Sequence, residues 1–216
     1  MDLEKIFLLD EDIKKYVATQ KDNLIFLLRI GSSLHKEEFT IKSDIDYILI
    51  LDTLHPDFIN QFPNRISPAL DKLKKNENNS LFYWRVELKS YEEHPIIISI
   101  YTLDKFLKYT RERHGNKIYI LNEHLFLLGN KNLLEKYKRI YTPNIQTAIS
   151  DLETLKNPKY RIKFLWAWRS VALLKNNVWL HNKKEIKEYV NINYNNYIED
   201  YKYLENELSK LIKEKN

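Results

Sequence analysis

The first quarter of the chain combines one helix-like apolar pattern with two strand-like runs. Apolar residues at helical spacing, from Ile6 to Val17, predict an amphipathic helix over residues 3–20. Two compact apolar runs follow, and they predict strands over residues 24–30 and 44–52 because each is short and rich in isoleucine and leucine. The chain therefore opens as a mixture of helix and sheet.

The middle of the chain continues this mixture. Aromatic and β-branched residues predict strands over residues 81–90 and 96–102. Residues 57–75 are predicted to be helical, with Pro63 and Pro68 each ending or kinking a segment because proline lacks an amide hydrogen. Further helices are expected over residues 103–113 and 133–141.

After Pro143 the strand patterns disappear and only helical ones remain. The helices expected there span residues 145–155, 160–175, 183–189 and 193–213, and we expect them to pack as a bundle. The fold class is therefore α+β. We expect one domain over residues 1–143, with a small β-sheet flanked by helices, and a helical domain over residues 144–216.

Two aspartates at the start of the second predicted strand favour metal-assisted phosphoryl transfer. Side chains alternate along a strand, so Asp44 and Asp46 point to one face, about 6–7 Å apart. Mg²⁺ prefers oxygen ligands and is usually held by one or two carboxylates together with substrate phosphates. At the end of the first strand, Gly31 lets the backbone approach a phosphate, and Ser32 adds a hydroxyl donor. The alternative is a turn glycine followed by two solvated aspartates.

The stretch Ile30-Gly31-Ser32, followed after eleven residues by Asp44-Ile45-Asp46-Tyr47, resembles a known signature. It is similar to the hydrophobic-Gly-Ser and Asp-x-Asp motif of the nucleotidyltransferase superfamily that includes DNA polymerase beta. In length and layout the chain is most similar to the aminoglycoside nucleotidyltransferases. The resemblance implies a sheet with mixed strand directions and a helical C-terminal domain that binds the acceptor.

A third carboxylate is expected on a neighbouring strand, and Glu87 is the candidate. It is an acid within an otherwise apolar stretch. The segment Trp84-Arg85-Val86-Glu87 resembles the strand that supplies the third acid of the aminoglycoside nucleotidyltransferases. There this acid helps to bind metal or acts as general base. The alternative is an ion pair with Arg85 or Lys89 on a solvated face. Glu92 and Glu93 are rival candidates, but they lie in a predicted turn.

The resemblance assigns a role to each of these residues. A nucleoside triphosphate, ATP or another, is the expected donor, and its phosphates would lie against the glycine turn while Mg²⁺ joins them to the carboxylates. The residues assigned to the nucleotide are Gly31, Ser32, Ser33 and Ser43, and those assigned to the metal are Asp44, Asp46 and Glu87. The same three acids are the candidate catalytic residues, with Glu87 orienting or deprotonating an acceptor hydroxyl.

Composition limits the other possibilities. With 216 residues, 44% of them hydrophobic, the chain can bury a proper core. No apolar stretch reaches the length of a membrane span and the N-terminus lacks a signal-peptide pattern, so a cytoplasmic location is expected. The absence of cysteine excludes disulfides, thiolate metal sites and cysteine nucleophiles.

Charge and the remaining motifs narrow the partners. A net charge of +5 suggests attraction to anions, and a nucleoside triphosphate satisfies it as well as a polynucleotide. The lysines are interleaved with acids, which favours solvated helix faces over a nucleic-acid surface. The chain has three glycines and no Walker-type or Gly-x-Gly-x-x-Gly motif, which disfavours dinucleotide or P-loop binding. The six histidines lack zinc-binding spacing and are interpreted as loop or helix-end residues: His35, His55, His94, His114, His124 and His181.

In the helical half, Trp166 and Trp168 are predicted to pack in the core, the alternative being that one of them lines the acceptor site. For Arg169 and Lys183, a surface salt bridge is favoured over contact with the triphosphate. Asp151 and Glu153 are interpreted as favourable charges in the first turn of a helix, the alternative being that one of them replaces Glu87 as base.

Three functions follow. The first is an adenylyltransferase, or a transferase of another nucleoside monophosphate, acting on a hydroxyl of a cationic small-molecule antibiotic such as an aminoglycoside. The second keeps the chemistry but has RNA or protein as the acceptor, as in toxin–antitoxin systems, and predicts a continuous basic track. The third is a non-catalytic nucleotide-binding relative. Neither the oligomeric state nor the acceptor can be predicted from fold-level resemblance.

Overall fold

The computed structural model of the chain contains two compact units. The structure describes residues 3–36, 39–40, 43–65, 73–75, 84–91, 94–112, 120–140, 144–156, 164–195 and 200–215. One unit comprises Met1–Lys108 and His124–Lys136, and the other comprises Tyr109–Glu123 and Tyr137–Asn216. The expected division into a domain over residues 1–143 that carries the motif and a helical domain over residues 144–216 that binds the acceptor stays a prediction.

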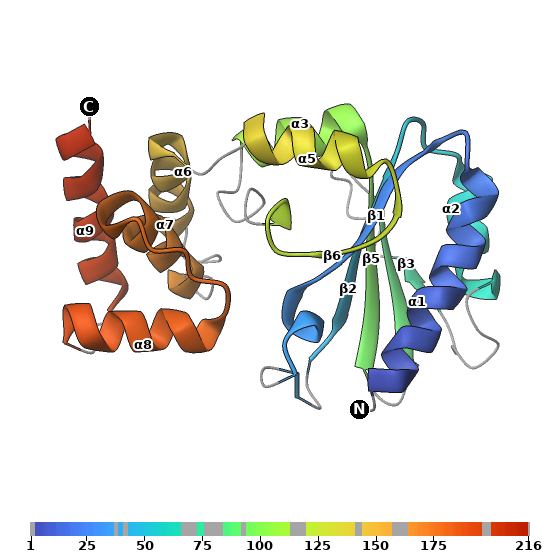
Figure 1. Cartoon of the computed structure of the whole chain (residues 1–216), viewed down its shortest axis with the longest axis horizontal. Helices are drawn as coiled ribbons and strands as arrows, with labels where there is room; N and C mark the ends of the chain where they lie inside the picture. Colours follow the sequence, from blue (N-terminus) through green and yellow to red (C-terminus); the bar gives the residue numbers. More distant parts are fainter. Residues whose placement is uncertain are drawn as a thin grey trace. The chain divides into compact units, whose positions relative to one another are not determined.

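The first unit is built on a six-stranded sheet with the order β3-β4-β5-β2-β1-β6 (Figure 1). The strands are β1 (Leu24–Ile30), β2 (Ile45–Leu51), β3 (Leu73–Lys75), β4 (Trp84–Tyr91), β5 (His94–Thr102) and β6 (Leu125–Gly129). Strands β2 and β5 are parallel, and the other neighbouring pairs among the described strands are antiparallel. Strand β2 lies inside the sheet, so its neighbours on both sides satisfy its backbone and fix its position.

Helices α1 (Leu3–Val17) and α2 (Pro56–Arg65) cover one face of this sheet (Figure 1). Their apolar residues form one core with alternate residues of β2 and β5, among them Ile45, Tyr47 and Ile96. A short 3-10 segment, η1 (Ala18–Gln20), continues α1. Because strand residues alternate between faces, Asp46 belongs to the face that α1 and α2 do not cover.

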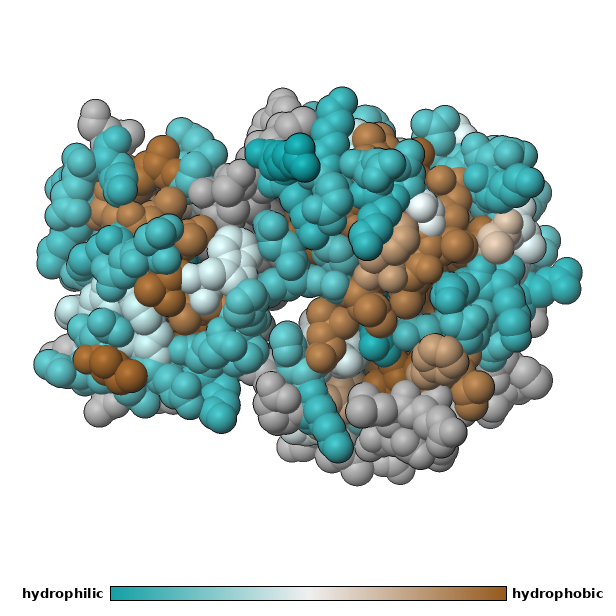
Figure 2. Space-filling model, in the orientation of Figure 1, coloured by the Kyte–Doolittle hydropathy of each residue, from teal (hydrophilic) through white to brown (hydrophobic). Residues whose placement is uncertain are grey.

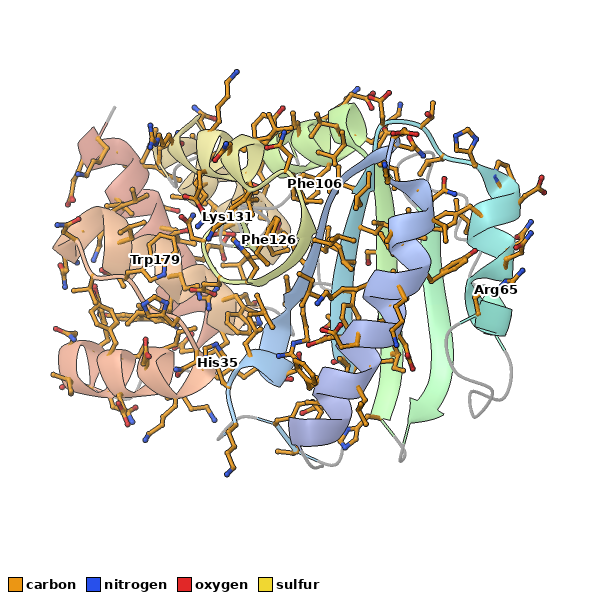
Figure 3. All side chains as sticks on the ribbon, turned by 45° about the vertical axis from the view of Figure 1, so that its right-hand side comes forward. His35, Arg65, Phe106, Phe126, Lys131 and Trp179 are labelled. Atoms are coloured by element: carbon orange, nitrogen blue, oxygen red, sulfur yellow. The ribbon has the colours of Figure 1, made fainter. Side chains whose placement is uncertain are left out.

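Helix α3 (Leu103–Glu112) packs on that opposite face at one end of the strands. The ring centroid of Phe106 lies 6.3 Å from that of Phe26 and 5.6 Å from that of Tyr101. Phe106 and His35 lie toward opposite ends of the strands (Figure 3). His35 directly follows the 3-10 turn η2 (Gly31–Leu34), so the aromatic packing under α3 is remote from this turn.

The second unit is helical. Its main helices are α6 (Ile145–Lys156), α7 (Phe164–Asn176), α8 (Lys183–Tyr194) and α9 (Tyr201–Lys215), and α5 (Lys131–Ile140) runs across the boundary between the units. Trp168 is fully buried, with its ring centroid 4.8 Å from that of Tyr194 and 6.4 Å from that of Tyr203. This burial confirms the core role predicted for Trp168. Hydrophilic residues cover much of the visible surface of these helices, and apolar residues lie between the helices (Figure 2).

The predicted fold class is confirmed: an α+β chain with a mixed sheet flanked by helices, followed by a helical bundle. The strands expected over 24–30 and 44–52 are β1 and β2. Among the described residues, no helix has the length and apolarity needed to cross a membrane.

Three local expectations are wrong. The helix predicted to extend to residue 75 ends at Arg65, and Leu73–Lys75 is a strand because pairing with β4 outweighs local helix preference. Strand β6 was not expected, since its apolar run is short and becomes a strand only by pairing with β1. The helix expected to end at residue 189 continues to Tyr194, where Asn195 adopts the left-handed conformation that ends helices.

Candidate functional site

The two aspartates lie at the start of the interior strand β2. Asp44 immediately precedes the strand, and Asp46 is its second residue. The residues on either side of Asp46 are Ile45 and Tyr47, and both are buried in the core below α1 and α2. Asp44 and Asp46 are partly exposed, and alternation assigns them to the same face of the strand. The buried remainder of β2 anchors this pair of carboxylates.

Gly31 lies directly beside Asp46. Ile30, the last residue of β1, pairs with Asp46 across the sheet, so the chain turns at Gly31 next to the carboxylate. Gly31 has φ +78°, and a Cβ atom at this position would lie 3.1 Å from Oδ2 of Asp46. The position therefore favours glycine for two reasons: the backbone is left-handed, and a Cβ atom would make a tight contact that the Asp46 carboxylate relieves only by shifting a few tenths of an ångström.

The hydroxyl groups around this turn differ in their surroundings. Ser33 is 4% exposed, and its Oγ donates to the carbonyl of Ile30 at 3.2 Å. Ser32 is partly exposed, and its carbonyl accepts from the backbone N–H of His35 at 3.1 Å. The Oγ of Ser43 accepts from the backbone N–H of Thr40 at 3.0 Å. Ser33 and Ser43 thus stabilise the loop backbone, and Ser32 is the more accessible hydroxyl of the turn. The nucleotide contacts predicted for all three serines stay predictions.

One histidine near the aspartates lies in a different element from the one predicted. The sequence predicts a loop or helix-end position for His94, but His94 is the buried first residue of β5. Its Nδ1 lies 2.8 Å from the carbonyl oxygen of Ser43, the residue before Asp44. The sequence gives little sign of this contact, because Ser43 and His94 are 51 residues apart and meet only through the pairing of β2 with β5.

A buried polar group supports the same two strands from the α1 side. Asp10 of α1 accepts a hydrogen bond from the Tyr47 hydroxyl at 2.8 Å and pairs with Arg29 at 3.2 Å. Burial raises the pKa of Asp10, although Arg29 and Tyr47 act in the opposite direction. Arg29 and Tyr47 are partners across the sheet and lie next to Ile30 and Asp46 in sequence. Asp10 therefore ties α1 to the ends of both strands that carry the site.

Glu87 has a defined place in the strand register. It pairs with Ile97 of β5, and Ile97 pairs with Asp46 of β2. The three residues form one row across neighbouring strands, with about 10 Å between the backbones of β4 and β2. On its other side Glu87 pairs with Lys74 of β3. The side chain of Glu87, and the rivals Glu92 and Glu93, lie outside the described part of the structure, so the role of Glu87 stays a prediction.

The donor set fits a hard divalent cation. Asp44 and Asp46 offer carboxylate oxygens, and Mg²⁺ is commonly held by two carboxylates and completed by substrate phosphates and water. Within the described residues, no three acidic or histidine side chains cluster in a way that could hold a metal ion. Asp44 and Asp46 therefore fit a cation whose remaining positions would be completed by a phosphate-bearing substrate and water.

A buried ion pair dominates the polar interior of the second unit. The Arg169 guanidinium lies 2.7 Å from Oε2 of Glu123 and also donates to the carbonyl of His181. Trp179, marked in Figure 3, donates from its indole nitrogen to Oε1 of Glu123 at 3.1 Å. Burial raises the pKa of Glu123 to about 7, although Arg169 and Trp179 act to lower it. The surface salt bridge expected for Arg169 is therefore wrong, because the side chains of Arg169 and Glu123 are only 6% and 13% exposed.

Two further residues of this unit differ from expectation or add to it. Asp151 lies in the middle of helix α6, and the first turn of that helix contains no acidic residue. The expectation that Asp151 is a favourable charge in a first turn is therefore wrong. The side chain is buried and accepts a hydrogen bond from Ser170, and burial raises its pKa to about 7. Trp166 is partly exposed, and the Arg169 guanidinium carbon lies 4.3 Å from its ring centroid while Nζ of Lys183 lies at 5.9 Å.

Comparisons with known proteins add little. No protein-family model matches the chain, and no curated protein sequence matches it. Among solved structures, a spectinomycin adenyltransferase from Enterococcus faecialis, crystallised with ATP and spectinomycin, superposes with a TM-score of 0.49 and 14% identity over 94% of this chain and 99% of that one. A nucleotidyltransferase-like protein from Exiguobacterium sibiricum 255-15 gives a TM-score of 0.39 and 8% identity over 95% of this chain and 75% of that one. At these TM-scores, neither similarity carries weight as evidence of fold or activity.

Proposed function

We propose that this protein is a Mg²⁺-dependent nucleotidyltransferase that moves a nucleoside monophosphate, from ATP, to a hydroxyl group and releases pyrophosphate. The observation that carries the proposal is the contact between Asp46 and Gly31. Two aspartates enter an interior strand, and one of them lies against a left-handed glycine turn with an accessible serine. A phosphate group bound at this turn would lie beside both carboxylates, which is the arrangement that metal-assisted phosphoryl transfer requires.

In this proposal the chain's own residues position the donor. The backbone of the Gly31–Ser32 turn would bind the β- and γ-phosphates, because glycine permits close approach of the backbone. Asp44 and Asp46 would hold the cation and so fix the α-phosphate relative to the strand. When bound, Mg²⁺ would polarise the α-phosphate and neutralise charge on the pyrophosphate.

Transfer would follow by in-line displacement. The acceptor hydroxyl oxygen forms a bond to the α-phosphorus while the bond from that phosphorus to the pyrophosphate oxygen breaks. The proton of the hydroxyl passes to the Glu87 carboxylate, which acts as general base. The shared row of Glu87, Ile97 and Asp46 across the sheet supports this role.

For the acceptor, we propose a hydroxyl of a small-molecule antibiotic, with cationic aminoglycosides as the leading class. This choice follows from the resemblance of the motif and of the strand that carries Glu87. Acceptors among RNA or proteins, and a non-catalytic role, are the outcomes that would displace it.

The experiment measures pyrophosphate release from each nucleoside triphosphate with Mg²⁺, against a panel of aminoglycosides, spectinomycin and lincosamides. The control is Asp44→Asn/Asp46→Asn, which keeps the size of both side chains but removes their charges. We expect release that depends on one acceptor and disappears in the double variant. Binding of Mg²⁺ and triphosphate without release across the panel would contradict the small-molecule acceptor. Release that persists in the double variant would contradict the site.

A further inference from the structure

We propose that His94 is a positioning residue that fixes the backbone of Ser43 and Asp44, and thereby the geometry of the two carboxylates. The inference rests on the proposed function, because it concerns the same metal and nucleotide site. His94 is 3% exposed and lies at the beginning of β5, beside the segment that leads into β2. Its side chain is buried and contacts the carbonyl of Ser43 in that segment.

The hydrogen bond from His94 has one possible direction. Its Nδ1 lies 2.8 Å from the carbonyl oxygen of Ser43, and a carbonyl can only accept. Nδ1 therefore carries the proton. Both the neutral tautomer with this proton and the imidazolium provide the donor, so the contact does not depend on the charge of the ring.

The strand pairing explains why a side chain makes this contact. The parallel register of β2 and β5 begins with Ile45 opposite Ile96. The residue before Ile96 is Pro95, which has no backbone N–H to donate to the chain before Ile45. Pro95 therefore cannot donate a backbone hydrogen bond to the segment before Ile45, whereas the His94 imidazole supplies a donor to Ser43.

Ser43 is also held from its other side. Its N–H donates to the carbonyl of Thr40 at 2.8 Å, and its Oγ accepts from the N–H of Thr40 at 3.0 Å. Asp44 is thus the single residue between an anchored Ser43 and the first paired residue of β2. Restraints on both sides limit the positions that its carboxylate can take relative to Asp46.

His94 also connects this loop with the glycine turn. The ring of Phe39 packs against the imidazole with 4.6 Å between centroids. The N–H of Phe39 donates at 3.1 Å to the carbonyl of His35, which directly follows Gly31–Leu34. Contacts from His94 therefore reach both segments that would bind the metal and the phosphates. We infer that His94 sets their relative position without touching the substrate.

The test compares His94→Leu with His94→Asn. Leucine fills a similar volume but removes the donor, whereas the Asn side-chain amide can donate from near the place of Nδ1. The control is Ile98→Ala, which creates a cavity in the same strand and destabilises the fold without touching Ser43. All variants are studied well below their melting temperatures.

Two readouts are used: affinity for ATP in the presence of Mn²⁺ or Mg²⁺, and hydrogen exchange of the backbone amides around Ser43–Ile45. We expect His94→Leu to weaken metal-dependent ATP binding about five- to tenfold and to speed exchange in this segment, because one buried hydrogen bond is lost. His94→Asn should recover most of both effects. Ile98→Ala should lower the melting temperature and leave affinity close to that of the native protein.

The outcomes separate this inference from the proposed function. Native affinity in His94→Leu, or an equal loss in Ile98→Ala, would overturn the positioning role. If the native protein shows no metal-dependent ATP binding, the proposed function fails. Hydrogen exchange then still decides whether His94 restrains Ser43, and unchanged exchange in His94→Leu would overturn that restraint.

Discussion

The Asp46 carboxylate lies so close to Gly31 that a side chain at position 31 would be in tight contact with it. One of its oxygens is 3.1 Å from the place of a Cβ atom on Gly31, whose backbone has φ +78°. The contact joins the turn after β1 to the carboxylates that begin β2. Two short motifs that are separate in the sequence are therefore adjacent in the fold.

Gly31→Ala should impair the site more than its small size suggests. The left-handed backbone costs about 1–2 kcal/mol for an L-residue, and the new methyl group would displace the Asp46 carboxylate. We expect a loss of about 1–3 kcal/mol in the free energy of unfolding and at least tenfold weaker metal-dependent ATP binding. Chemical denaturation and calorimetry measure the two effects. The neighbouring Ser32→Ala is the control, and it should leave stability nearly unchanged; native-like ATP affinity in Gly31→Ala would contradict this reading of the turn.

Glu87→Gln should separate catalysis from binding. If Glu87 is the general base, turnover should fall about 10²–10⁴-fold while triphosphate binding is retained. The matched control is Lys74→Met, because Lys74 is the register partner of Glu87 on β3. If both variants instead lose only a little stability and keep full turnover, Glu87 is one half of a cross-strand ion pair.

Asp151 should make the second unit less stable as pH rises. Burial raises its pKa to about 7 from an ordinary value near 3.8, so the folded state holds a proton that the unfolded state releases. Its stabilising effect is complete below about pH 4 and is lost as pH rises toward 7. Asp151→Asn resembles the protonated form and lacks this loss.

Unfolding curves of the native protein and Asp151→Asn between pH 4 and 8 measure this effect. We expect the stability of the variant relative to the native protein to increase across this range, by at most about 4 kcal/mol. A difference that stays constant with pH would show that Asp151 is ionised in the folded protein.

The ion pair between Arg169 and Glu123 should contribute more to the free energy of unfolding than a more exposed pair with a similar distance between nitrogen and oxygen. Removing Glu123 leaves the Arg169 guanidinium, which stays charged, without its partner in a largely buried place and costs about 3–5 kcal/mol. In the pair of Lys14 with Glu11, which lies at 2.6 Å and is more exposed, the loss should stay below about 1 kcal/mol. A double-mutant cycle with Arg169→Ala and Glu123→Ala measures the coupling, and independent effects of the two substitutions would refute the pairing.

The sequence is sufficient to predict the elements that carry the candidate site. The apolar runs that become β1 and β2 are compact and strongly patterned, and the Gly31 turn and the two aspartates lie at their ends. The helical character of the second unit is equally visible, because helix periodicity is a local property.

Contacts between distant segments could not be predicted in this way. Strands β3 and β6 exist because they pair with β4 and β1, and their own sequences are too short to indicate it. The sequence pattern predicts a loop or helix-end position for His94, and only the register of β2 and β5 places it beside Ser43. Glu123 had no recognisable motif, and only the fold shows its contact with Arg169.

The central claim is that Asp44, Asp46 and the Gly31 turn form one site for a divalent cation and a triphosphate. Calorimetry of ATP binding with and without Mg²⁺, for the native protein and for Asp44→Asn/Asp46→Asn, tests it without knowledge of the acceptor. We predict that native binding requires Mg²⁺ and that the double variant, folded as judged by circular dichroism, loses it. Mg²⁺-dependent binding of equal strength in both proteins would contradict the claim, as would absence of ATP binding by the native protein.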